Sequence, residues 1–128
     1  MRLHRFDAAA GRPVVAHGSR LLQVPLTDPE GKARAACLHL APGDRIARHE
    51  ADSRQLLCVT VGSGWVAGAD GIRAPITAGQ AAAFERGEAH ETGTDIGLTA
   101  IVLEGDGFSV WAPPADPPPT GAVGPVSR

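Results

Sequence analysis

The chain has 128 residues, of which 43% are apolar, and this is enough for one domain built around a single core. Its net charge of -2 gives no general attraction for nucleic acid or for an anionic membrane surface. No apolar run approaches the length of a transmembrane helix, and residues 1–7 are charged rather than signal-like. We therefore expect a cytoplasmic protein that binds neither nucleic acid nor membranes.

Many short strands separated by Gly-rich turns are predicted along the chain. Asp70-Gly71 and Gly62-Ser63-Gly64 each have the composition of a hairpin turn. Pro25 removes a backbone donor, so the strand that contains it is expected at a sheet edge. Only the region of Ala8 has a helical character. The pattern predicts an all-β fold, with one barrel of two antiparallel sheets from residues 20 to 104. The predicted strands cover residues 2–6, 13–16, 20–26, 33–40, 45–51, 55–61, 65–67, 72–76, 81–84 and 98–103.

The composition changes after residue 112. Residues 1–112 are predicted to form a single domain, with edge strands at its N-terminal side. Prolines crowd residues 113–128, which we expect to be extended or disordered. Cys37 and Cys58 lie in predicted strands without metal-binding spacing, so both are expected to be buried, reduced thiols.

Residues 43–64 carry the candidate site. Side-chain alternation places Gln55 on one face of its strand with Leu57 and Val59. A polar residue at the head of an apolar face indicates a site at the mouth of a barrel. The short link 52–54 predicts that His49 lies opposite Gln55 across a hairpin.

This stretch resembles the first motif of the cupin superfamily, with Ala51 in the place of a second histidine. Its other motif positions are occupied by Gly43, His49, Gln55 and Gly62. Residues 79–94 resemble the second motif through Gly79, Gly87 and His90, although Glu85 and Thr94 replace the usual Pro and Asn. The resemblance covers residues 33–104. It implies a cupin-type jelly-roll β-barrel and a homodimer that pairs through the N-terminal segment.

The resemblance also implies a metal site on His49, Gln55 and His90, with a gap at Ala51. Such a site suits a divalent transition metal, for which we consider Zn, Fe, Mn and Ni. The alternative is a polar pocket without metal, in which the two histidines hydrogen-bond to each other or to a ligand.

Four further side chains near the motifs have two interpretations each. Alternation directs Glu50 out of the barrel, whereas a bulge at Ala51 would turn its carboxylate inward to replace the missing ligand. In a metal-dependent enzyme, Glu50 would be the carboxylate that moves protons. Arg48 and Arg54 either clamp a carboxylate substrate or are solvated. For Trp65 we favour packing in the sheet over lining of the pocket.

Three functions are compatible with this pattern, because a fold does not determine a function. The first is a metal-dependent enzyme of the oxygenase, isomerase or lyase type that acts on a small organic molecule. The second is a binding or sensing domain without turnover. The third is a metal-free enzyme that uses His49 and His90 as acid and base.

Overall fold

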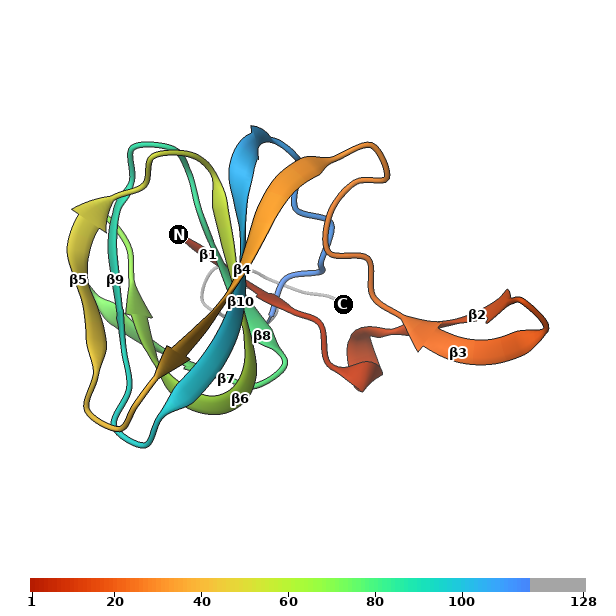
Figure 1. The fold of residues 1–128 in the computed structure, drawn as a ribbon, viewed down its shortest axis with the longest axis horizontal. Helices are drawn as coiled ribbons and strands as arrows, with labels where there is room; N and C mark the ends of the chain where they lie inside the picture. Colours follow the sequence, from red (N-terminus) through yellow and green to blue (C-terminus); the bar gives the residue numbers. More distant parts are fainter. Residues whose placement is uncertain (116–128) are drawn as a thin grey trace, which may run out of the picture.

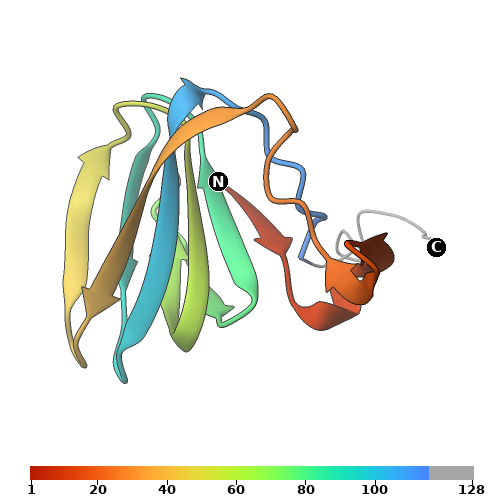
Figure 2. The same cartoon turned by 45° about the vertical axis from the view of Figure 1, so that its right-hand side comes forward.

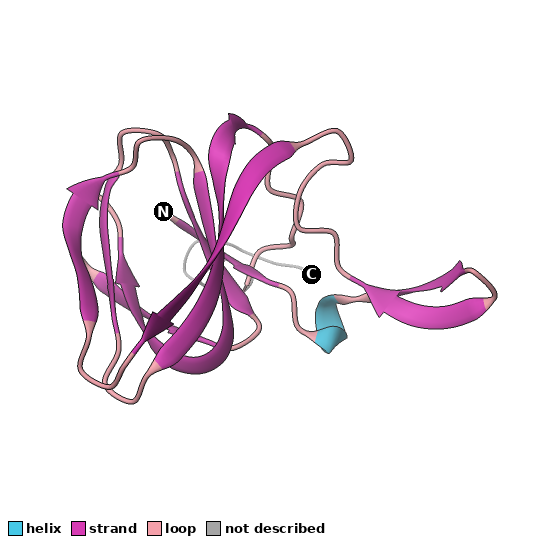
Figure 3. Ribbon diagram, viewed as in Figure 1, coloured by secondary structure: helices cyan, strands magenta, loops and turns pink. Residues whose placement is uncertain are grey.

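The computed structural model describes residues 1–115, which form ten β-strands and one short 3-10 helix (Figures 1 and 3). The helix, Ala8–Ala10, falls in the region where the sequence has helical character. The strands are β1 (Arg2–Arg5), β2 (Arg12–Ala16), β3 (Ser19–Gln23), β4 (Lys32–Leu40), β5 (Arg45–Glu50), β6 (Gln55–Ala67), β7 (Arg73–Thr77), β8 (Gln80–Phe84), β9 (Ala89–Gly93) and β10 (Leu98–Gly107).

Strand β6 connects two antiparallel sheets that lie on either side of the barrel (Figure 2). The first sheet has the order β1-β8-β6-β10-β4. In the second sheet, the C-terminal half of β6 pairs with β7 and β9, and β9 pairs with β5. The expectation of an all-β jelly roll is therefore confirmed.

The hairpin expected at Gly62-Ser63-Gly64 is wrong, because β6 runs through these residues. A Cβ atom at Gly64 would lie 2.1 Å from the carbonyl oxygen of Gly93. Gly62 has φ +83°, and a Cβ there would lie 2.2 Å from the carbonyl oxygen of Gly97. These glycines therefore let neighbouring backbones approach the place where β6 passes from one sheet to the other. The hairpin expected at Asp70-Gly71 is present between β6 and β7.

Apolar side chains of the first sheet form a cluster on each of its faces. Leu57, Val59 and Ala100 pack between the two sheets, with Phe84 and Ile76. On the opposite face, Leu56 and Cys58 pack with Phe108. Side-chain alternation along β6 explains why adjacent residues belong to different clusters.

The expectation of two buried thiols is right for Cys58 and wrong for Cys37. Burial raises the pKa of Cys58 to about 12. Cys37 lies on β4, which pairs only with β10 among the described strands and stands at the edge of the first sheet.

The barrel departs at both ends from the predicted range of residues 20 to 104. The barrel does not begin at residue 20, because β3 pairs only with β2 and this hairpin projects from the barrel, whereas β1 pairs with β8 (Figure 1). The amide of Arg5 donates to the carbonyl of Pro113, and the amide of Ala115 donates to that of Leu3. Residues 113–115 thus lie against β1, and the rest of the predicted tail, 116–128, lies outside the described residues.

None of the helices in residues 1–115 has the length and apolar character needed to cross a membrane.

Candidate functional site

A cavity of about 310 Å³ lies between the two sheets. Its volume is at the lower end of the range for small-molecule sites. Five strands supply its walls, three from the first sheet and two from the second. The lining residues are Ala36, Leu38, Ile46, His49, Gln55, Leu57, His90, Thr92, Val102 and Glu104.

His49 and His90 face each other in the ladder between β5 and β9. Their ring centroids are 4.4 Å apart, and the ring planes are tilted by 53°. His49 Nδ1 lies 2.8 Å from the carbonyl oxygen of Ala47, and His90 Nδ1 lies 3.0 Å from that of Glu88. A carbonyl oxygen only accepts, so Nδ1 carries the hydrogen in both rings, and Nε2 is the unprotonated nitrogen of each neutral imidazole.

His90 is buried, with 5% of the residue exposed. Its ring stacks on Phe84 with 4.3 Å between centroids. Burial lowers the pKa of His90 below its ordinary value, and the charge of a protonated His49 would lower it further. The neutral imidazole is therefore favoured, which is the form that coordinates metals and accepts protons.

Gln55 lines the same cavity from the opposite sheet. It does not lie across a hairpin from His49, because β5 pairs with β9 and the N-terminal half of β6 pairs with β8 and β10. His49, Gln55 and His90 line one cavity, as predicted. They reach it from two sheets that face each other, and not from the two strands of one hairpin.

Comparisons with known structures identify the fold. No protein-family model and no curated protein matches the sequence. An RmlC-like cupin-family protein with a double-stranded β-helix fold, from Methanocaldococcus jannaschii, superposes with a TM-score of 0.55 and 14% identity, over 81% of this chain and 89% of that chain. A predicted oxalate decarboxylase from Thermotoga maritima superposes with a TM-score of 0.52 and 23% identity, over 62% of this chain and 68% of that chain. A Klebsiella pneumoniae protein with a double-stranded β-helix domain superposes with a TM-score of 0.53 and 20% identity, over 79% of this chain and 85% of that chain. The chain has the cupin fold. At these identities the likeness concerns the fold, and the function is argued from the site.

Among the described residues that line the cavity, Glu104 is the one carboxylate, and it is not among the residues predicted from the sequence. The strand predicted over residues 98–103 stops just before Glu104, whereas β10 continues to Gly107. Side chains alternate along a strand, so Glu104 points to the same inner face as Ala100 and Val102. The sequence pattern therefore contains the information that places Glu104 in the cavity.

Neither Glu50 nor Ala51 lines the cavity. Glu50 is exposed, and the irregularity in β5 falls between Ile46 and His49 rather than at Ala51. Ala51 is 3% exposed, donates its amide hydrogen to the carbonyl of Glu88 and accepts one from the amide of Gly87. These hydrogen bonds hold Ala51 against the loop before β9, so Ala51 does not leave the predicted gap in the cavity wall. The inward turn of Glu50 is not observed either.

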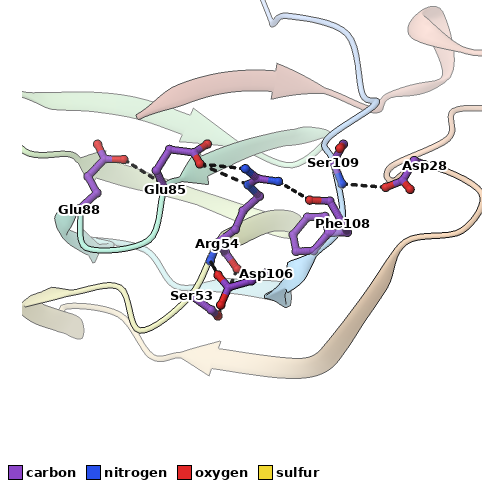
Figure 4. Close-up of polar contacts among 8 residues, drawn as sticks. All are labelled: Asp28, Ser53, Arg54, Glu85, Glu88, Asp106, Phe108 and Ser109. Carbon is purple, nitrogen blue, oxygen red and sulfur yellow. Dashed lines mark hydrogen bonds and ion pairs between the residues drawn. The ribbon is translucent and has the colours of Figure 1, made fainter.

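Arg48 and Arg54 both have structural partners. Arg48 donates to the carbonyls of Gly68 and Ala69. Arg54 donates to Glu85 Oε1 and to the carbonyl of Phe108, and its amide donates to Asp106, which links three loops (Figure 4). Neither arginine is placed to clamp a ligand in the cavity.

Trp65 packs on the sheet and does not line the cavity. The guanidinium carbon of Arg73 lies 3.7 Å from the centroid of its ring. A Cβ atom at Gly93 would lie 2.4 Å from the same ring, so Trp65 covers that glycine in the ladder between β6 and β9.

The donor set predicted from the sequence consists of two imidazoles and one amide. Nowhere in residues 1–115 do three His, Cys, Asp or Glu side chains cluster closely enough to hold a metal ion. Two neutral imidazoles with free Nε2 atoms still suit Zn, Ni, Cu or Fe, and an amide oxygen is a weak third donor. The residues therefore fit a weakly held transition metal with open coordination positions.

Proposed function

We propose that this cupin binds a small, partly apolar organic molecule at a centre where His49 and His90 hold a divalent transition metal. Gln55 would supply the third donor. The remaining positions would be taken by water or by the bound molecule. Leu57, Val102 and other apolar side chains form the deeper walls against which the body of that molecule would pack.

The tautomers of the two histidines carry this proposal. Histidines that coordinate metals usually donate their other ring hydrogen to a carbonyl or carboxylate, which fixes the ring and raises its basicity. His49 and His90 both do so through Nδ1, from neighbouring positions in one ladder. Within residues 1–115 neither ring makes a second hydrogen bond, so both Nε2 atoms remain available to a ligand.

We further propose that the site is enzymatic, of the oxygenase, isomerase or lyase type. A bound metal would polarise an oxygen atom of the organic molecule. The apolar walls would exclude water from that oxygen and orient the molecule. Glu50 takes no part in this proposal, because it is exposed and does not line the cavity.

A metal-free site is the second candidate. It is favoured by the lack of a third clustered ligand in the described residues, and by the lowered pKa of His90. A neutral, buried imidazole beside a more exposed one would act as a base and an acid toward a bound molecule.

Calorimetric titration with Ni²⁺ separates the two candidates. The protein is first treated with a chelator, and the titration is run above the ordinary histidine pKa of about 6.5. We expect one site, with affinity that falls as the pH drops through the histidine range because protons compete for Nε2. His49→Ala and His90→Ala should each weaken binding by about tenfold or more.

His39→Ala is the matched control, since His39 is exposed on β4 and does not line the cavity. It should bind Ni²⁺ as the parent does. A parent protein that binds no Ni²⁺, or a His49→Ala/His90→Ala variant that binds it undiminished, would reject the metal centre in favour of the metal-free site.

A further inference from the structure

A row of three polar residues crosses the first sheet at the mouth of the cavity. Gln55 of β6, Glu104 of β10 and Arg34 of β4 are successive cross-strand partners. The next inward row, Leu57, Val102 and Ala36, is apolar. Partners that lie opposite each other in antiparallel strands point to the same face, so the whole polar row faces the side on which His49 and His90 lie.

Glu104 carries the negative charge of this row. Its side chain is 33% exposed, and Arg34 Nη2 donates to Glu104 Oε1 over 2.9 Å. Arg34 itself is 83% exposed. An ion pair as open to water as this one contributes little to stability, so its carboxylate exchanges partners at low cost.

The identities of Gln55 and Glu104 depend on each other. Two carboxylates directly opposite in a ladder would repel, and an amide at position 55 avoids this. A cation held by imidazoles and an amide alone would keep its full charge in a partly buried cavity, which is unfavourable without a counter-charge. Glu104 is the cavity residue that provides this counter-charge, and it lies on β10 directly opposite Gln55 of β6.

We infer that Glu104 is the carboxylate of the metal centre, and that Arg34 competes with the cation for it. This inference rests on the metal centre proposed above. In the arrangement described here Glu104 is paired with Arg34, and no three-ligand cluster is formed in residues 1–115. Cation binding would draw the carboxylate away from Arg34 and toward the histidines.

The test is calorimetric titration with Ni²⁺ of the parent, Glu104→Gln, Arg34→Gln and the double variant. Glu104→Gln should weaken binding by about tenfold or more. Arg34→Gln should tighten it by roughly two- to fivefold, because the carboxylate no longer has a competing partner. In the double variant the gain from Arg34→Gln should vanish, since no carboxylate is left to release.

Two matched controls have the same chemistry outside the cavity. Glu85→Gln removes a carboxylate that is paired with Arg54, and Arg86→Gln removes an exposed guanidinium that is paired with Asp106. Both should bind Ni²⁺ with the parental affinity. Because Arg34 is so exposed, Arg34→Gln is expected to fold even if Glu104→Gln does not, and circular dichroism checks both.

The outcomes separate this inference from the proposed function. A parent that binds Ni²⁺ while Glu104→Gln binds it equally well overturns the role of Glu104 and leaves the histidine centre standing. An Arg34→Gln variant without tighter binding overturns the competition. A parent that binds no Ni²⁺ overturns both the centre and the inference.

Discussion

At the scale of single residues, His90 connects stability with the site. It lies between Phe84 and His49, and burial lowers its pKa from the ordinary value of 6.5. Around that pH the unfolded chain takes up a proton that the folded chain does not. The unfolded state then binds more protons, so the free energy of unfolding must decrease as the pH falls below about 6.5.

We expect chemical denaturation in the presence of a chelator to show this loss of stability. His90→Asn removes the titrating group and should flatten the dependence on pH below about 6.5. His17→Asn, at the exposed turn of the β2–β3 hairpin, is the control and should keep the parental slope. A His90→Asn variant as pH-sensitive as the parent would show that other groups are responsible.

The sequence predicts residues well where a motif fixes the spacing. Gly43 and Gly87 adopt positive φ values in the expected turns, and His49 and His90 reach one cavity although they are distant in sequence. Ala51 was misplaced, because its backbone bonds to residues 87 and 88 depend on tertiary packing that local spacing does not encode. Glu104 lies beyond the end of the predicted strand 98–103, because the apolar pattern ends at Leu103 while β10 continues to Gly107.

At the scale of elements, β6 determines how the two sheets meet. Its first half pairs with β8 and β10, and its second half pairs with β7 and β9. The triplet Gly62-Ser63-Gly64 has the composition of a hairpin, and composition alone does not distinguish a reversal from a close approach of two backbones. The contact with Gly93, far away in the sequence, is what requires a glycine at position 64.

Gly64→Ala should therefore destabilise the barrel by about 1–3 kcal/mol, because its new methyl group would overlap the carbonyl of Gly93. Gly107→Ala is the control, since the nearest atoms to a Cβ there lie at an ordinary contact distance of 3.5 Å. Urea denaturation midpoints measure both changes. Equal stability of Gly64→Ala and Gly107→Ala would contradict the close approach.

At the scale of the whole molecule, the β2–β3 hairpin exposes apolar side chains. It projects from the barrel and pairs only with itself among the described strands (Figure 1). Val15, Leu21 and Leu22 are 73%, 44% and 55% exposed on it. An isolated two-stranded hairpin is marginally stable in water, and exposed apolar side chains of this kind mark an interaction surface.

We propose that a second copy of the chain covers this hairpin, in a homodimer. Light scattering at micromolar concentration should give the mass of a dimer for the parent and of a monomer for Val15→Glu/Leu22→Glu, whose side chains share one face of the hairpin. Ile72→Glu, at an exposed position outside the hairpin, should remain dimeric. A monomeric parent would contradict the homodimer, and a dimeric double variant would move the interface elsewhere.

The central claim is that His49 and His90 hold one metal ion through Nε2. Pulsed electron paramagnetic resonance of the Cu²⁺-loaded protein tests it most directly, because the remote nitrogen of a coordinated imidazole modulates the echo. Here the remote nitrogen is Nδ1, which is bonded to the carbonyl of Ala47 or Glu88. We predict two coordinated imidazoles in the parent and one in either His49→Ala or His90→Ala. A parent spectrum without imidazole modulation, or single variants that keep both imidazoles, would contradict the metal centre.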